Sequence, residues 1–416
     1  MNDDERSIFD TTEFAPLASA WQHRQRELAR RYAYYDGSVY KRSDLAWLGP
    51  RFYKGARALY LPLSRAVDID VGIVPGGWSF PKGSPASWEA ARKLLMGWSR
   101  WRTDGVLLVH YGASYGLCGL KVCDLRQQKR ILMKPLDPTK YMLFSEALYD
   151  DDPTMALMVD QRCEPRSDED YEYAEAVTPD YIRTFKDGEP FGFDGREAEY
   201  PNELGFVPFV EIEHIRTGRQ YGEPTYQKTI PLLDQVNQQA SYLAEIIAKN
   251  AEPQWAVFGA EPSDMHKSGD NIWFFPAGAD AKPLLAGVDI DGVLAFIKEV
   301  ADNMHSSLPE LSFDELRSKD QIATATIELQ LAELTIKTQR IRPNYDAGLV
   351  RGFQMVGLAA ATMGLSELTA LADDNLDLDE DRPVLPVDAL TQAQIDTAKS
   401  KPTSRGTPNV PGTQAD

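Results

Sequence analysis

Two amphipathic segments enclose a short aromatic-rich segment near the middle of the chain, and this arrangement constrains the fold more than any other feature. Apolar residues recur every three or four positions in both segments, which predicts a helix over 223–250 and a second over 287–308, ending before Pro309. The segment between them, 251–286, alternates turn residues with short apolar runs that are typical of strands. We therefore expect an antiparallel pair of helices joined by a small β-containing unit.

The sequence on either side of this pair predicts an α+β chain of several units. In chain order they are an N-terminal part of helices and strands (1–222), the first helix of the pair (223–250), the β-containing unit (251–286), the second helix (287–308), a polar loop (309–321), a long helix (322–345), a short helical unit (346–372) and a disordered acidic, Pro- and Gly-rich tail (373–416).

The N-terminal part is predicted to pass from helices to strands. We expect a mobile polar start over 1–13, a helix over 15–35, short strands and loops over 50–81 and a helix over 87–113. Short runs separated by turn residues then predict a β-rich region. The runs predicted as strands are Leu117–Cys123, Arg130–Met133, Tyr141–Glu146, Ala156–Asp160, Tyr171–Val177 and Tyr181–Phe185.

The charge balance argues against a conventional DNA-binding domain. The chain has 63 acidic and 44 basic residues, a formal net charge of -19, whereas a protein that grips phosphates carries basic patches. An acidic wall past which DNA slides is compatible with this charge. Four arginines in the first predicted helix either contact nucleic acid or, as we favour, form intersubunit ion pairs on a solvated face. They are Arg24, Arg26, Arg30 and Arg31.

The residues that usually carry catalysis form no recognisable motif. The three cysteines (Cys118, Cys123 and Cys163) and the five histidines lack metal-ligand spacing, so we expect buried or half-buried free thiols, no metal and no cofactor. Acidic loops such as Asp151-Asp152 fit a glycosidase or a metal site, but we favour solvated loops. We expect no enzymatic activity; a carbohydrate hydrolase, suggested by 8 Trp and 18 Tyr, is the enzyme alternative.

The start of the chain is acidic and polar, and no run of about 18 apolar residues occurs. We therefore expect a soluble protein made in a cytoplasm, with no membrane contact.

The order helix, small β insert, helix, polar loop and long helix resembles the core of the portal proteins of tailed bacteriophages, over roughly residues 20–365. Local patterns similar to that family are Tyr34-Tyr35-Asp36-Gly37, His110–Gly116, Gly205–Val210, Gly222-Glu223-Pro224, Ile230–Asn237 and Ser306–Pro309. One departure is the segment Ser318–Ala323, where relatives often have Ser-Gly-x-Ala at the start of the long helix. It affects the bounds of the polar loop.

The resemblance implies a portal fold: an α/β wing, a two-helix stem, a clip formed by 251–286, a tunnel loop at 309–321, a long wing helix and a short helical crown at 346–372. It implies a closed ring, usually of twelve subunits, at one capsid vertex, assembled in the host cytoplasm as a late protein of the virion. Its partners would be double-stranded DNA passing without sequence specificity, the terminase large subunit, head–tail adaptor proteins, and the major capsid and scaffolding proteins. A different phage head–tail adaptor ring is the structural alternative.

Two groups of residues follow from the resemblance. The tunnel loop would place charged side chains beside DNA: Glu310, Asp314, Glu315, Arg317, Lys319 and Asp320. The clip would use aromatic side chains to contact neighbouring subunits or docking partners: Trp255, Phe258, Trp273, Phe274 and Phe275. An ordinary surface connection is the alternative for the loop, and a core formed within one chain is the alternative for the clip.

Overall fold

A computed structural model describes most of the chain, and the account that follows is confined to those residues. They are 7–40, 59–145, 152–164, 170–193, 195–218, 221–251, 254–258, 266–267, 273–274, 280–284, 290–311, 324–382 and 384.

The described elements confirm the α+β class. The α-helices are α1 (Ala18–Tyr35), α2 (Leu63–Ile73), α3 (Ala86–Trp98), α4 (Trp101–Tyr115), α5 (Ile230–Ala251), α6 (Ile290–Ser307) and α8 (Thr324–Met363). The strands are β1 (Leu117–Leu125), β2 (Arg130–Leu136), β3 (Tyr141–Phe144), β4 (Met155–Cys163), β5 (Asp170–Val177), β6 (Tyr181–Lys186), β7 (Glu189–Pro190), β8 (Glu199–Pro201), β9 (Phe209–Glu213), β10 (Gln254–Phe258), β11 (His266–Lys267), β12 (Trp273–Phe274) and β13 (Asp280–Leu284).

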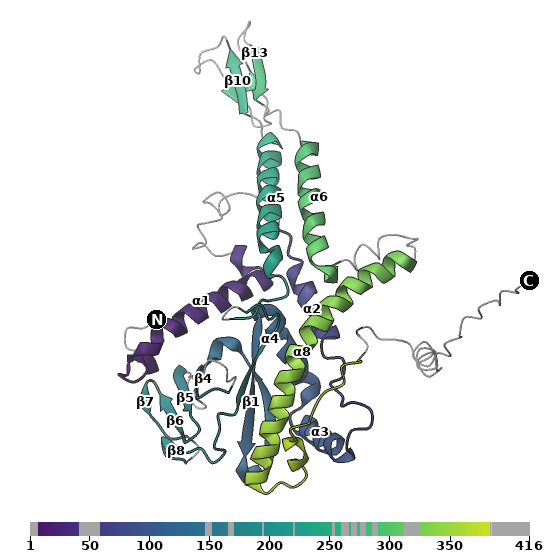
Figure 1. Cartoon of the computed structure of the whole chain (residues 1–416). Coiled ribbons are helices and arrows are strands. Elements are labelled where there is room, and N and C mark those ends of the chain that lie inside the picture. The colour runs from purple at the N-terminus through teal and green to yellow at the C-terminus, as the bar shows by residue number, and fades with distance from the viewer. Residues whose placement is uncertain are drawn as a thin grey trace, which may run out of the picture.

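A stalk projects from a broad body (Figure 1). Helices α5 and α6 run side by side away from the body, and β10 and β13 lie at their far end. In the body, the antiparallel sheet β2-β1-β9 lies against α3, α4 and α8. The main hydrophobic core lies between this sheet and these helices, where Leu120, Met133 and Phe353 are fully buried.

A second antiparallel sheet forms the side of the body near the N-terminus. Its order is β3-β4-β5-β6-β7, and β8 also pairs with β6. All six predicted strand runs are present as β1 to β6, whereas the short strands β7 and β8 and the buried strand β9 were not predicted. The described part of the predicted mobile start is instead packed on this sheet, because Ile8 and Phe14 are buried against Leu157 and Phe185.

Two secondary-structure predictions for the N-terminal half are wrong. Residues 63–73 form helix α2, not strands, because its face with Leu63, Ala66 and Val67 packs into a cluster with α1 and the stalk base. The single helix predicted over 87–113 is broken between α3 and α4 at Arg100, which has a φ of +53°. The break lets Trp101 pack beside Trp78, with ring centroids 5.8 Å apart.

The predicted boundary between a long helix and a separate crown is also wrong. Helix α8 continues to Met363, although Pro343 lies inside it. Tyr345, Leu349 and Phe353 on one of its faces are buried in the main core. Tertiary packing therefore carries the helix past the proline, and residues 346–372 belong to the body.

The first ten residues of the predicted disordered tail are ordered. Leu376 and Leu378 are buried in the main core, and the Asp379 amide donates to the Ser79 carbonyl at 2.8 Å. Arg382 forms an ion pair with Asp346 of α8. The rest of the predicted tail, apart from residue 384, lies outside the described residues.

Of the four arginines of α1, Arg26 and Arg30 are exposed, as expected for a solvated face, whereas Arg24 and Arg31 are not. Arg24 is buried, pairs with Glu211 at 2.7 Å and lies over the Tyr141 ring. Arg31 donates to the carbonyls of Tyr115 and Gly222. These two side chains therefore fasten α1 to the body.

Candidate functional site

The candidate site is the stalk together with the region where it joins the body. Each stalk helix is amphipathic, and the apolar faces meet: Leu233, Val236 and Leu243 of α5 are buried, as are Val300 and Met304 of α6. The predicted helix bounds, 223–250 and 287–308, agree closely with α6, but α5 begins later. Residues 223–229 instead form a β-bridge at Glu223 and a short 3-10 helix.

Polar side chains fix the base of α5 to the body. The phenols of Tyr34 and Tyr40 donate to the Asp234 carboxylate at 3.0 and 2.8 Å. Burial raises the pKa of Asp234, although these two hydrogen bonds act to lower it. Asn237 accepts from the backbone amide of Tyr60 at 2.6 Å and donates to its carbonyl at 3.1 Å. These hydrogen bonds therefore anchor the base of the stalk to the body.

The upper part of the stalk presents apolar side chains to solvent. Ile247 of α5 is 50% exposed, and Leu294 and Phe296 of α6 are 49% and 41% exposed. Exposed large apolar groups gathered on one projection are typical of surfaces that contact another chain.

The tip of the stalk contains the strands predicted for the clip. β10 pairs with β13 so that Gln254 lies opposite Leu284, and β11 pairs with β12. Trp255 and Phe258 lie in β10, and Trp273 and Phe274 lie in β12. Phe275 lies outside the described residues, and the contacts of the clip aromatics stay a prediction.

The predicted tunnel loop is described only at its first residues. Asp314, Glu315, Arg317, Lys319 and Asp320 lie outside the described residues. Glu310 lies in the 3-10 helix η10 (Pro309–Leu311) and is fully buried. Its assignment as a residue facing DNA is therefore wrong, because its carboxylate pairs with Lys337 of α8 inside the protein.

Glu310 belongs to a buried polar cluster where the stalk joins the body. The Lys337 ammonium donates to Glu310 Oε1 at 2.5 Å and to the Thr225 carbonyl at 3.4 Å. The Thr225 hydroxyl donates to the Asp70 carboxylate of α2. His214, which follows β9, places Nε2 2.9 Å from Thr225 Oγ1. The cluster thus connects η10, α2, α8 and the end of β9.

The hydrogen bonds define the protonation of the histidine. Since the Thr225 hydroxyl proton is directed to Asp70, His214 Nε2 carries a proton and donates to Thr225 Oγ1. His214 Nδ1 then accepts from the Tyr345 hydroxyl, 2.9 Å away. Burial lowers the pKa of His214 and so favours this neutral form, although the Asp70 carboxylate, 3.4 Å from Nε2, acts in the opposite direction.

The two carboxyl groups of the cluster differ in acidity. Burial would raise the pKa of Asp70, but the Lys337 charge and the bonds from His214 and Thr225 hold it below its usual value. Burial and the Asp70 charge raise the pKa of Glu310 to about 7, against the effect of Lys337. Glu310 Oε2 is buried and has no hydrogen-bond partner among the described residues. One ammonium thus faces two carboxyl groups, and Glu310 takes up a proton near neutral pH.

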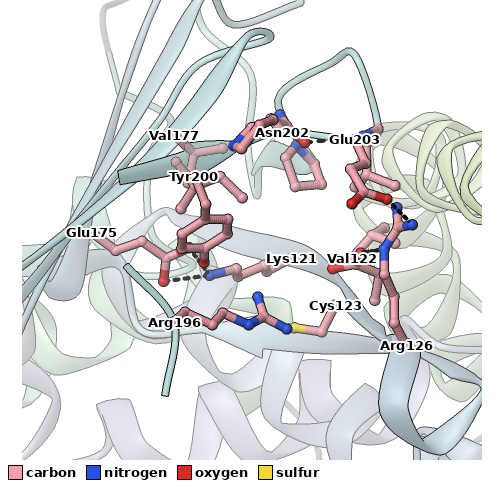
Figure 2. A pocket seen from close by; sticks show the side chains of 15 residues that line it. Lys121, Val122, Cys123, Arg126, Glu175, Val177, Arg196, Tyr200, Asn202 and Glu203 are labelled. Carbon is pink, nitrogen blue, oxygen red and sulfur yellow. Dashed lines mark hydrogen bonds and ion pairs between the residues drawn. The ribbon is translucent and has the colours of Figure 1, made fainter. Parts of the chain in front are cut away.

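A pocket of about 370 Å³ opens between the two sheets of the body (Figure 2). Its charged side chains are largely paired with one another: Lys121 donates to Glu175 at 2.8 Å, and Arg126 pairs with Asp124 and Glu203. Burial raises the pKa of the Cys123 thiol in its wall, so the nucleophilic thiolate is disfavoured.

Other features bear on the chemistry expected from the sequence. Cys118 is buried and Cys123 is half-buried, as predicted, whereas Cys163 is exposed, which contradicts the prediction for that residue. Asp152, from one of the acidic loops, forms an ion pair with Arg351. Within the described part of the chain, no cluster of three His, Cys, Asp or Glu side chains is placed to bind a metal, and no helix has the length and hydropathy needed to span a membrane.

Comparisons with known proteins gave structural neighbours only. No family model matches the sequence, and no curated protein matches it. Among solved structures, a chain from the virion of a native gene transfer agent (GTA) particle is 12% identical, with a TM-score of 0.40, covering 89% of this chain and 94% of that one. A chain from the neck of the native GTA particle, computed with C12 symmetry, is 14% identical, with a TM-score of 0.36 and coverages of 81% and 85%. A chain from the neck of the empty GTA particle, computed with C6 symmetry, is 15% identical, with a TM-score of 0.38 and coverages of 88% and 93%.

Sequence reasoning did not find the buried cluster. Asp70, His214, Thr225, Glu310 and Lys337 come from five separate segments, and none has a neighbour in the sequence that marks its role. Only the folding of α2, β9, η10 and α8 against one another brings them together.

Proposed function

We propose that this chain is the portal protein of a tailed bacteriophage. It would form a ring at one capsid vertex and provide the channel for genome packaging and ejection. The stalk would be the stem of the ring, and its tip would be the clip to which terminase and head–tail connector proteins dock. DNA would pass without sequence-specific contacts, which suits a chain with a net charge of -19.

The observation that supports this proposal most is the exposed apolar surface of the stalk. Ile247, Leu294 and Phe296 are exposed on α5 and α6. The bases of both helices are anchored to the body, α5 by hydrogen bonds and α6 by the burial of Met304. A single copy leaves them in water, whereas identical neighbours in a closed ring cover them by heterologous contacts. The order of stem, tip and long helix α8 also follows the resemblance found in the sequence.

A head–tail adaptor ring of another type is the second candidate, because it would also bury the exposed stalk. We further propose that the chain is not an enzyme. The pairing of Lys121 and Arg126 with carboxylates in the body pocket, and the raised pKa of the Cys123 thiol, support this view over a hydrolase.

Light scattering of the purified full chain tests the ring directly. A ring of twelve subunits has a mass of 12 × 46.6 = 559 kDa, and negative-stain images should show a central hole. Particles that stay at 46.6 kDa over a wide range of protein and salt concentrations would contradict the proposal.

Removing the tip tests its assignment as a docking clip. Because Gln254 lies opposite Leu284, the ends of this unit are one strand spacing apart, about 5 Å, and a short Gly-Ser linker can replace residues 254–284. We expect this variant to keep its helical circular dichroism but to lose binding to its terminase or adaptor, measured by co-sedimentation. Unchanged binding would show that the docking site lies elsewhere. Replacement of the exposed body loop at Lys82-Gly83 by the same linker is the control.

A further inference from the structure

A small basic pocket lies at the base of the stalk, on one side of α6. It has a volume of about 170 Å³, and Ser307 at the end of α6 forms part of its wall. Lys228 of the 3-10 helix before α5 and Lys337 and Arg340 of α8 contribute three positive charges to its lining, whereas Glu223 contributes one negative charge and the buried Glu310 pairs with Lys337. Such a positive site is unusual on a chain whose net charge is -19.

Two of these cations are available to a ligand. Lys337 is held by Glu310 at 2.5 Å, but Lys228 and Arg340 are exposed and have no carboxylate partner among the described residues. Ile336 lies one helical turn before Arg340, on the same side of α8, and is 66% exposed. A protein surface that carries a carboxylate beside apolar atoms would pair with these cations and also cover Ile336. A free ion would pair with the cations but leave Ile336 exposed.

The opposite side of α6 offers such a carboxylate. Asp302 is exposed, and its carboxylate has no partner among the described residues. It precedes Ser307 by five residues, which places it about 140° around the helix and about 7.5 Å further along it. Asp302 therefore points away from the basic pocket of its own chain and lies less than two helical turns further along the stalk. Glu299 and Asp302 outnumber Lys298 on this side.

We propose that Asp302 of one copy enters the basic pocket of the next copy and pairs there with Arg340 and Lys228. This inference rests on the proposed ring and names one contact that would close it. Two complementary patches on opposite flanks of one subunit are what a heterologous ring requires. This contact between subunits excludes water from Ile336. Each copy supplies Asp302 to the neighbour on one side and receives Asp302 from the neighbour on the other side.

Charge reversal tests the contact in the full chain. Asp302→Arg and Arg340→Asp each place like charges at every interface, and each should raise the protein concentration for half-assembly by roughly tenfold or more, measured by light scattering. The double variant should assemble like the parent. Glu367→Arg and Arg102→Asp, which alter exposed charges elsewhere on the body, should leave assembly unchanged.

Mixing the two single variants gives the sharper result. In a ring that alternates the two, the introduced arginine meets the introduced aspartate at one interface, and the native Asp302 meets the native Arg340 at the next, so an equimolar mixture should assemble. If the double variant assembles but the mixture does not, Asp302 and Arg340 pair within one chain, and the inference is overturned. Single variants that assemble like the parent would overturn it too, while leaving the ring proposal intact. A parent that forms no ring would overturn both.

Discussion

Replacing Gly357 with alanine is expected to lower the free energy of unfolding by about 2–3 kcal/mol. Gly357 lies on the face of α8 that meets the short 3-10 helix η11 (Thr369–Ala372), and a Cβ atom there would lie 2.2 Å from the Ala372 nitrogen and 2.7 Å from its Cα. These are backbone atoms, so no side-chain rotation relieves the overlap. The gain of about 1 kcal/mol from better helix propensity offsets only part of the cost.

Gly72→Ala is the matched control for this prediction. Gly72 lies in α2, and no atom lies within 4 Å of the Cβ that alanine would add, so the change should be neutral or should stabilise the protein slightly. Urea unfolding followed by circular dichroism compares the two. Equal stability of both variants would mean that α8 and η11 are not packed this closely.

Glu310→Gln is expected to remove a pH dependence of stability between about pH 4.5 and 7. The pKa of Glu310 rises from 4.5 to about 7 on folding, so the folded chain binds more protons than the unfolded chain within this interval. The stabilisation is complete below the unfolded pKa and is lost as the pH rises through the folded pKa. A shift of this size corresponds to roughly 3 kcal/mol. Glutamine resembles the protonated carboxyl at every pH and can still accept from Lys337.

The measurement is the free energy of unfolding from urea titrations at pH 5 to 8.5, at one protein concentration. The parent should lose stability relative to Glu310→Gln as the pH rises, and the two curves should run parallel above about pH 8. Glu299→Gln, on the exposed side of α6, should follow the parent throughout. Curves for the parent and Glu310→Gln that run parallel over the whole range would contradict the buried cluster as described.

Local patterns predicted those elements whose residues alone define them. The short apolar runs at 117–123 and 130–133 predicted two strands, and they form β1 and β2. The spacing of apolar residues in the stalk helices likewise indicated α5 and α6, since an amphipathic face is visible in the order of residues along the chain.

Other features depend on contacts between segments far apart in the chain. Pro343 favours a break in an isolated helix, but the burial of Tyr345 and Phe353 in the main core keeps α8 continuous. Arg24 of α1 was expected on a solvated face, but it is buried beside Glu211, which lies 187 residues further along the chain.

The sequence by itself determined the class, the paired helices and the strands β1 to β6, because periodicity and turn chemistry act between near neighbours. Only the tertiary structure decided that Glu310 is buried beside Lys337 instead of facing DNA. A carboxylate in a polar stretch of sequence is expected to be solvated. Glu310 can be buried because the Lys337 ammonium, 27 residues away on another helix, pairs with it.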